Sequence, residues 1–533
     1  MKIALLTPCS LNISAFGART ISASLKARGH GVRLLALPVI PEVYRGKDGC
    51  LLAREYRFSD SLLDQICERT ADCDLVGISF MSQYRGCARQ ITAALKARRE
   101  LPVVWGGVHP TVRPEECLDH ADIVCIGEGE ETMVELADRL HEGRGFEEVP
   151  NLCFRRGGTI QKNPLRPLLH DLDRLPFLDY DPDNNLVRDP KLDRIVALDD
   201  DMFERFLARV PYVKGHPLRS FMFSTTRGCP YKCTYCVNDF YREMYGSKGY
   251  FRRMSNGRVV AELEAVIRRH PGIEEIEFCD DNFAARPVSE ILDFCKVYKE
   301  RIGLPFQVLM TPGFITEDRI APMLDAGMVF VETGIQSAAD SSAKLYHRSL
   351  EVQELLAASE VLKRHRGEMA PPCYHLILDN PFESVEETLA TLDVTLKLPR
   401  PFWFKRSSLI PFPGTSVYDS FKEHGHLKDE QKQVFDKILE MPGTCYLNFL
   451  FFMNSQNHPK WLIRLLAAPS LVAFFNRPSW TPVFGRTENA LRTASKILRW
   501  TKLLLRGDWA AVKNRIALAG KIPSGVPSSQ ASV

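Results

Sequence analysis

The sequence predicts an α/β protein made of two successive sets of alternating strands and helices, followed by a helical region. Residues 1–145 contain five short apolar runs separated by amphipathic stretches, the pattern of buried parallel strands with covering helices. A second series of six strand patterns begins at Phe221 and ends near Pro413, again with helical patterns between the strands. The length of 533 residues is sufficient for two or three hydrophobic cores.

The first set of strands predicts a doubly wound, Rossmann-like sheet over residues 1–145. Its apolar runs are Ile3–Leu6, Val32–Leu37, Leu75–Ser79, Val103–Trp105 and Ile123–Ile126. Ligands of such sheets bind at the carboxyl ends of the strands. Residues 146–219 are rich in proline and aspartate and predict an irregular connector that packs on its neighbours.

The second set predicts a partial (β/α)6 barrel over residues 220–415. Its expected strands are Phe221–Thr225, Glu275–Phe278, Phe306–Met310, Met328–Thr333, Tyr374–Leu378 and Trp403–Leu409. Six strand–helix units within this length favour a partial barrel over a second open sheet. Residues 416–533 continue with helical patterns and form the predicted helical, basic C-terminal region.

Composition and charge limit the expected location and partners. The chain is 45% hydrophobic and 25% charged with a net charge of +3, so as a whole it has no strong attraction to nucleic acid. The first residues lack the pattern of a secretory signal, and no run reaches the roughly 18 apolar residues of a membrane span. Fifteen cysteines then indicate a reducing compartment. We expect a cytoplasmic protein, with peripheral contact at the inner face of the membrane as an alternative.

Three cysteines follow the first strand of the predicted barrel with the spacing CxxxCxxC: Cys229, Cys233 and Cys236. Three thiolates on one short loop can ligate three irons of a 4Fe–4S cluster and leave the fourth iron open. Zinc is the alternative, but a closed zinc site needs four protein ligands, usually delivered by CxxC pairs. No fourth cysteine lies near in sequence, so the spacing favours the iron–sulfur cluster.

The same motif, with Tyr235 before its last cysteine, resembles the radical S-adenosylmethionine (SAM) superfamily over about residues 220–415. The resemblance implies that the open iron binds the amino and carboxylate groups of SAM. It further implies that one electron from the cluster cleaves SAM to methionine and a 5′-deoxyadenosyl radical. A flavodoxin or a ferredoxin is the electron donor we expect.

The resemblance also implies further cofactor contacts within the barrel. They are Asp280, Asp281, Glu332, Gln336, Ser337 and Arg348. The two aspartates end the second strand, where the family places groups that hold an ammonium. The next three residues end the fourth strand, which resembles the family's ribose-contacting strand, and the arginine lies where several members place a cation for the methionine carboxylate. For each of them, a polar residue that caps a helix or strand end is the alternative.

Residues 1–145 resemble the cobalamin-binding domain that precedes the barrel in one large radical SAM class. The candidate cobalamin contacts are Gly106, Gly107, His109, Gly127, Glu128 and Gly129, which follow two of the apolar strands. Glycines there allow the backbone to approach a bulky ligand, although helix capping alone explains such a motif equally well. The Asp-x-His-x-x-Gly motif that supplies a lower axial histidine is absent from residues 1–145. The resemblance therefore implies cobalamin without a histidine ligand from that motif, and we expect His109 to serve its own loop.

These resemblances together imply a cobalamin-dependent radical SAM methyltransferase that methylates an unactivated carbon of a small-molecule or lipid-like substrate. A non-methylating oxidative cyclase of the same superfamily is an alternative. An iron–sulfur RNA-binding or regulatory protein is an alternative from another class. The C-terminal region lacks regularly spaced aromatic residues and the barrel loops carry no basic stripe, so we expect no nucleic-acid partner. The strand-poor C-terminal region also argues against an enzyme of transfer RNA thiolation.

The C-terminal region is strongly basic. From His458 onward, twelve lysines and arginines face only two acidic residues. Trp461–Phe475 is apolar with a single charge, and Arg486–Arg506 mixes leucines with cations. Such a basic amphipathic segment suits a membrane interface. A helical cap on the barrel is an equally good interpretation.

Overall fold

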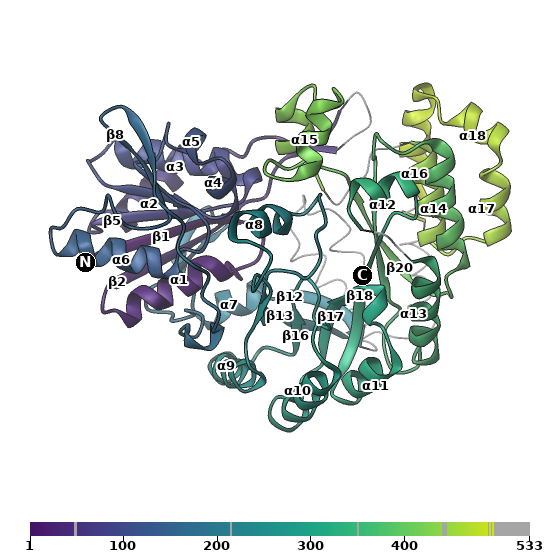
Figure 1. Ribbon diagram of the computed structural model, residues 1–533, viewed down its shortest axis with the longest axis horizontal. Helices are drawn as coiled ribbons and strands as arrows, with labels where there is room; N and C mark the ends of the chain where they lie inside the picture. Colours follow the sequence, from purple (N-terminus) through teal and green to yellow (C-terminus); the bar gives the residue numbers. More distant parts are fainter. Residues whose placement is uncertain are drawn as a thin grey trace.

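The structure, a computed structural model, describes residues 1–46, 51–213, 216–348, 351–439, 445–488, 490–491 and 493–494. Two mainly parallel sheets lie side by side, one in the N-terminal domain and one in the barrel that follows it (Figure 1). The N-terminal sheet has the order β11-β10-β2-β1-β5-β6-β7-β8-β9 among the described strands. The barrel sheet has the order β12-β13-β16-β17-β18-β19-β20.

The parallel centre of the N-terminal sheet agrees with the predicted doubly wound fold. Its strands are β1 (Lys2–Cys9), β2 (Gly31–Pro38), β5 (Leu75–Ser79), β6 (Val103–Gly106) and β7 (Ile123–Cys125). Helices α1 (Phe16–Ala27) and α6 (Glu130–His141) pack on one face, while α2 (Asp60–Thr70) and α3 (Arg85–Lys96) pack on the other. In α1, the buried residues Ala18, Ser22 and Leu25 recur at helical spacing and direct one stripe toward the sheet.

Residues 146–219 do not form the irregular connector that the sequence suggested. They contain β8 (Leu152–Arg156), β9 (Thr159–Lys162), β10 (Asn185–Asp189) and β11 (Arg194–Ala197), all in the N-terminal sheet. They also contain β12 (Ala208–Val213), which pairs antiparallel with the first barrel strand. These strands lie toward the sheet edges and several carry exposed polar residues, so they lack the continuous apolar runs of buried strands.

The barrel sheet is open, because β12 and β20 are edges that do not pair with each other. Its six parallel strands confirm the predicted partial barrel. They are β13 (His216–Phe223), β16 (Glu275–Phe278), β17 (Phe306–Met310), β18 (Met328–Gln336), β19 (Cys373–Leu378) and β20 (Trp403–Ser408). The covering helices are α9 (Asn256–Arg269), α10 (Val288–Arg301), α11 (Glu317–Asp325), α13 (Val352–Arg364) and α14 (Val385–Lys397).

Strand alternation gives the barrel an apolar outer face and a polar inner face. Ile276 and Phe278 are buried in the core beneath the helices, so Glu277 between them faces inward. Val331 and Leu376 are likewise buried on the outer side, which turns Glu332 and His375 toward the inside. Charged side chains are therefore collected on the concave face, where a ligand of a half-barrel can reach them.

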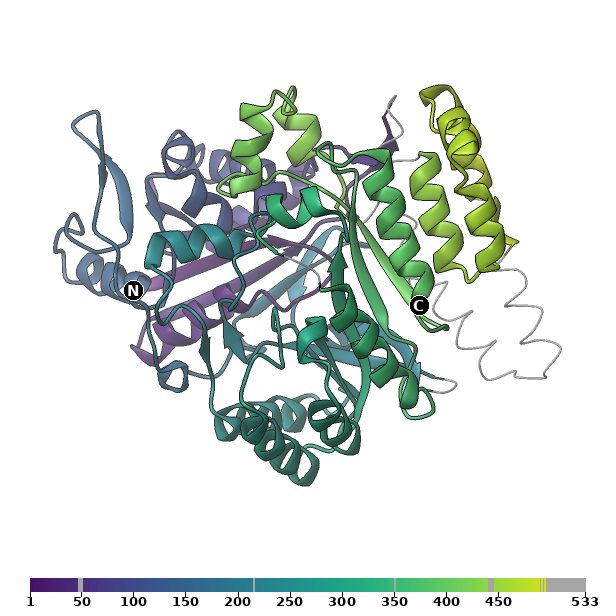
Figure 2. The ribbon, with the colours of Figure 1, turned by 45° about the vertical axis from the view of Figure 1, so that its right-hand side comes forward.

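The C-terminal region contributes to both halves of the molecule. Helix α15 (Ser416–Glu423) packs toward the N-terminal domain, where Arg113 hydrogen-bonds to Tyr418 and pairs with Glu430 at 2.9 Å. Helix α16 (Tyr446–Ser455) packs against α14 on the side of the barrel away from the N-terminal domain, and α17 (Lys460–Leu466) and α18 (Pro469–Phe475) pack on α16 (Figure 2). Within the described residues, no helix is both long and apolar enough to cross a membrane. The part of the predicted Arg486–Arg506 helix beyond residue 494 lies outside the described residues.

Candidate functional site

The three motif cysteines lie on the loop between β13 and α8 (Val237–Tyr245). The helix that follows the loop fixes the loop backbone. Arg242 of α8 donates hydrogen bonds to the carbonyl oxygens of Cys229 and, at 3.0 Å, of Tyr231. The Cys236 amide donates to the Cys233 carbonyl at 2.9 Å. The thiols are therefore presented from a backbone that is already fixed, as preorganised ligation requires.

The chemistry of these thiols fits an iron–sulfur cluster. Burial raises the pKa of Cys229 to about 11 and that of Cys236 to about 12, so without a bound cation both remain protonated at neutral pH. Positive irons stabilise the thiolates and reverse that preference. Three cysteines without a nearby fourth can hold a 4Fe–4S cluster whose remaining iron is free to bind SAM.

Tyr235 and Arg348, both predicted from the sequence, meet beside Cys233. Arg348 Nη1 lies 3.3 Å from the Tyr235 hydroxyl and 3.8 Å from Cys233 Sγ. Its Nη2 donates to the Gly334 carbonyl at 3.3 Å, which ties the guanidinium to the end of β18. A fixed cation next to the cluster loop can accept a carboxylate of a bound cofactor.

Asp280 has a different place from the one we expected. Its carboxylate is fully buried and accepts hydrogen bonds from protein groups at the base of the cluster loop. The donors are the Thr225 and Thr226 amides at 2.6 and 3.0 Å, the Ser224 hydroxyl at 3.1 Å, the Thr225 hydroxyl, and Arg286 at 3.4 Å. A carboxylate occupied in this way fastens the end of β13 to that of β16 and is not a direct cofactor contact.

Asp281 is the better placed of the two aspartates. It is exposed and accepts a hydrogen bond from Asn238 Nδ2 at 2.7 Å. The same amide nitrogen lies 3.6 Å from Cys236 Sγ, so Asp281 is one side chain away from the cluster loop. Its position therefore suits a contact to a cationic group bound near the cluster.

The predicted residues at the end of β18 differ in their surroundings. Ser337 is buried and donates to Glu383 at 2.6 Å, so its hydroxyl joins β18 to the start of α14 and is unsuited to a ribose contact. Gln336 is half-buried with a φ of 64°, a left-handed turn at the strand end. Glu332 faces the barrel interior, where it meets two residues that sequence reasoning did not select.

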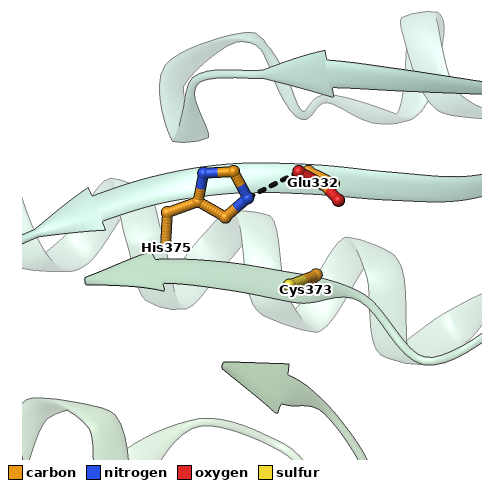
Figure 3. Close-up of side chains that lie close together, drawn as sticks. All are labelled: Glu332, Cys373 and His375. Carbon is orange, nitrogen blue, oxygen red and sulfur yellow. Dashed lines mark hydrogen bonds and ion pairs between the residues drawn. The ribbon is translucent and has the colours of Figure 1, made fainter. Parts of the chain in front are cut away.

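These two residues are Cys373 and His375 of the neighbouring strand β19 (Figure 3). His375 Nε2 and Glu332 Oε2 are 2.6 Å apart, and Cys373 pairs with Glu332 in the register of the two strands. Burial raises the pKa of Glu332, but the hydrogen bond with His375 and the charges of His375 and Lys405 together outweigh it, and the net pKa is lowered. Across the inner face, burial and the charge of Glu332 raise the pKa of Glu277 to about 7.

In the N-terminal domain, Gly107 and His109 are explained by their own loop. Gly107 has a φ of 96°, and a Cβ there would lie 2.8 Å from the Phe80 carbonyl oxygen. His109 is buried, with Nδ1 3.2 Å from the Ser82 hydroxyl. Burial and the charges of Arg85 and Arg113 lower its pKa to about 3, so it is uncharged. This arrangement removes His109 from the candidate cobalamin contacts.

The Gly127-Glu128-Gly129 segment forms a seam between the N-terminal domain and the cluster loop. Gly127 has a φ of 75°, and a Cβ would lie 1.8 Å from the Tyr245 hydroxyl oxygen of α8. Glu128 binds Arg252 at 2.6 Å and Arg227, two residues before Cys229, at 3.3 Å. The sequence pointed to a ligand for this motif, whereas the structure assigns Gly127 and Glu128 to contacts between domains.

The seam places the carboxyl ends of the N-terminal parallel strands, called here the ligand edge, next to the cluster loop. The loop at Gly414 approaches both α4 (Val108–Val112), which follows β6, and α8: a Cβ on Gly414 would lie 2.7 Å from Val112 and 3.2 Å from Phe240. Around Gly106 the space is more open, because a Cβ there would have its nearest neighbouring atom at 3.7 Å. The carboxyl ends of β1, β5 and β6 form the edge at which ligands of doubly wound sheets bind.

Comparison with known proteins agrees with this arrangement. The B12 binding domain family matches residues 4–137, and the Radical SAM superfamily matches residues 223–394. An uncharacterized methyltransferase of Pyrococcus horikoshii is 27% identical over 372 residues, 69% of this chain and 73% of that protein. The anaerobic magnesium-protoporphyrin IX monomethyl ester cyclase of Rubrivivax gelatinosus is 22% identical over 401 residues, 72% of this chain and 64% of that protein.

Among solved structures, the radical SAM methyltransferase TsrM from Kitasatospora setae, with cobalamin and a 4Fe–4S cluster bound, has a TM-score of 0.60. The identity is 17%, and the match covers 79% of this chain and 78% of that chain, so it shows a shared fold. The matches confirm the predicted fold class, enzyme class and cofactors, namely a 4Fe–4S cluster, SAM and cobalamin. The chain thus carries a B12-binding domain ahead of a radical SAM domain.

Proposed function

We propose that the protein is a cobalamin-dependent radical SAM methyltransferase that methylates an unactivated carbon of a small molecule. The observation that carries the proposal is the seam. Glu128, which follows a strand of the N-terminal sheet, holds Arg227, just before the cluster loop, and Arg252 on the strand that pairs with it. When bound, the cofactors supply a carbon-centred radical and a transferable methyl group. A substrate between the two domains is then within reach of both.

The chain's own residues bind and orient these groups. Cys229, Cys233 and Cys236 hold the cluster, and Arg348 beside Cys233 pairs with the carboxylate of SAM. Asp281, which accepts a hydrogen bond from Asn238 beside Cys236, offers a carboxylate oxygen to the amino group of SAM. The polar inner face of the barrel, with Glu332 at its centre, receives the remainder of SAM or the substrate.

Replacement of single cysteines tests the cluster assignment. In anaerobically reconstituted protein, Cys229→Ala, Cys233→Ala and Cys236→Ala should each abolish the release of 5′-deoxyadenosine from SAM and lower bound iron. Cys295→Ala, which alters a buried cysteine of α10, is the matched control and should keep both near the level of the unaltered protein. Full cleavage activity in any motif variant would contradict the assignment.

Methyl-labelled SAM separates methylation from the cyclase alternative. A methyltransferase incorporates the labelled methyl group, and its product gains the mass of a labelled methyl group in exchange for hydrogen. A cyclase product loses hydrogen and carries no label. Retention of cobalamin with an unlabelled product would be consistent with a radical SAM enzyme but would exclude methyl transfer. A flavodoxin or ferredoxin is the proposed electron donor for this assay.

We further propose that the substrate is lipid-like and is taken from a membrane surface. The C-terminal helices expose Trp461, Leu465 and Phe474, with 67%, 57% and 46% of each residue accessible. Arg464 and Arg477 lie close by in sequence, and Arg477 stacks on Phe474 at 5.5 Å. Aromatic side chains flanked by cations are typical of surfaces that enter the headgroup region of anionic membranes.

Vesicle co-sedimentation tests this surface. Binding to anionic vesicles should exceed binding to neutral ones, fall with added salt, and weaken in a Trp461→Ser, Phe474→Ser double variant. Leu192→Ser removes an apolar residue that is 63% exposed in the connecting segment, and it should leave binding unchanged. Equally low sedimentation with both vesicle types would favour a helical cap and a water-soluble substrate.

A further inference from the structure

The inner face of the barrel gathers three different metal-ligating side chains at one point. Glu332 of β18 and Cys373 of β19 are paired in the strand register, and His375 follows Cys373 by two residues, on the same face of β19. One ligand atom from each of the three lies within 4.8 Å of the other two. Figure 3 shows the carboxylate, the imidazole and the thiol side by side on the two strands.

The type and number of these ligands indicate a metal. Carboxylate oxygen, imidazole nitrogen and thiolate sulfur are the three ligand types of protein-bound Zn²⁺, at about 2.0–2.3 Å from the ion. Tetrahedral bonds of that length put ligand atoms about 3.3–3.6 Å apart, so small side-chain shifts from the present arrangement suffice. The 2.6 Å hydrogen bond between His375 and Glu332 already brings two of the atoms closer than a metal requires.

The surroundings leave room for a fourth ligand. About 25% of the Glu332 side chain and 16% of the His375 side chain remain accessible, while Cys373 is buried beneath them. Glu332 and a Cys373 thiolate are two negative charges, and a divalent ion balances both. Glu277 on β16 and Lys405 on β20 are close enough for their charges to interact with Glu332.

We propose that Glu332, Cys373 and His375 bind a divalent zinc-like metal ion on the inner face of the barrel, at a site distinct from the iron–sulfur cluster. Three protein ligands and one open position are the arrangement of a catalytic zinc site. The open position faces the barrel interior, so the ion can coordinate an oxygen or nitrogen atom of the substrate and orient it for reaction. The site itself does not depend on whether the reaction is methyl transfer.

Zn²⁺ and Co²⁺ are the probes for this site. To keep metal off the cluster motif, the full-length chain is used with Cys229, Cys233 and Cys236 all replaced by alanine and without added iron or sulfide. Dialysed against Zn²⁺, this protein should retain about one ion per chain. With Co²⁺ it should show the near-ultraviolet absorption of a thiolate–cobalt bond together with the visible bands of tetrahedral cobalt.

Single substitutions identify the ligands. Cys373→Ser should remove the thiolate absorption, and His375→Asn and Glu332→Gln should each weaken Co²⁺ binding by roughly tenfold or more. Cys295→Ser, which alters a buried cysteine on the outer side of the sheet, is the matched control and should leave binding unchanged. Zn²⁺ should also raise the thermal unfolding temperature, an effect absent from the three ligand variants.

Two results would overturn the proposal. Substoichiometric Zn²⁺ with no thiolate absorption would show that Glu332 and His375 form a hydrogen-bonded pair that binds no metal. Metal binding that survives Cys373→Ser and His375→Asn together, with circular dichroism showing a folded chain, would place the ion elsewhere. Because the cluster motif is absent from this protein, either result is independent of SAM cleavage and of the proposed methyl transfer.

Discussion

Glu128 is the residue on which the seam between the N-terminal domain and the cluster loop depends. Its carboxylate receives Arg252 Nη2 at 2.6 Å and Nη1 at 3.0 Å, and it lies 3.3 Å from Arg227 Nη1. Burial raises the pKa of Glu128, but the hydrogen bonds of Arg252 and the charge of Arg227 outweigh it and lower the net pKa. Only 4% of the Arg252 side chain is accessible, and Glu128 is the carboxylate that pairs with its buried charge.

The expected cost of Glu128→Ala follows from these contacts. Removing one partner of a fully buried ion pair destabilises by about 3–5 kcal/mol. This value must be reduced, because about a quarter of Glu128 and of Arg227 is accessible and Arg227 keeps its bond to Glu130. Arg252 also keeps hydrogen bonds to the carbonyl oxygens of Leu169 and Tyr250. We therefore expect the seam to lose about 2–3 kcal/mol.

Hydrogen exchange is the suitable assay, because a two-domain chain need not unfold in one step. Amides of β14 (Thr226–Arg227) and β15 (Arg252–Arg253) should exchange roughly 30- to 150-fold faster in Glu128→Ala, since each 1.4 kcal/mol is a factor of ten. Glu131→Gln is the control: its side chain is half exposed and lies 3.6 Å from Arg166, so exchange should change little. Equal exchange in the two variants would refute the seam.

Three further changes test other parts of the account. Gly127→Ala should destabilise the seam by about 2–3 kcal/mol, because its Cβ would lie 1.8 Å from the Tyr245 hydroxyl at a φ of 75°. The double variant Gly127→Ala, Tyr245→Phe should recover part of this loss, and equal stability of the single and double variants would contradict the clash. Asp280→Asn should lower iron retention after reconstitution, since a neutral amide cannot accept all the loop's donors, while Asp293→Asn on the outer helix α10 should not. Burial lowers the pKa of His270 to about 4, so as the pH falls His270 is protonated in the unfolded chain before it is protonated in the folded one. Its contribution to the free energy of unfolding is complete above about pH 6.5, and about 2 kcal/mol of it is lost between pH 7 and 5. Urea unfolding at both pH values checks this, and a loss that persists undiminished in His270→Gln would contradict it.

Local motifs were the part of the site that could be predicted from the sequence. The spacing of Cys229, Cys233 and Cys236 places all three on one loop whatever the rest of the chain does. The continuous apolar runs likewise predicted the central strands, because strands buried on both faces have little choice of composition. Strands β8–β11, at and next to the sheet edges, were missed, since most of them carry exposed polar residues and their sequences resemble loops.

Contacts between segments that are distant in sequence could not be predicted from local patterns. Glycine at position 127 was predicted to let the backbone approach a ligand, and only the fold shows that the Tyr245 side chain lies against it. Asp280 and Asp281 are neighbours in sequence with the same chemistry, and their different roles arise because β16 ends just before them and the chain then turns one carboxylate inward. Cys373 and His375 became partners of Glu332 through the register of β18 and β19 alone.

The electron paramagnetic resonance spectrum of cobalamin in the Co(II) state tests the central claim most directly. The claim is that the N-terminal domain holds cobalamin opposite the cluster loop and supplies no histidine ligand, because His109 is buried against Ser82 and Phe80. Full-length protein loaded anaerobically with cobalamin should retain it and show a cobalt spectrum without nitrogen superhyperfine splitting, identical in His109→Ala. Failure to retain cobalamin, or nitrogen splitting that disappears in His109→Ala, would contradict the account.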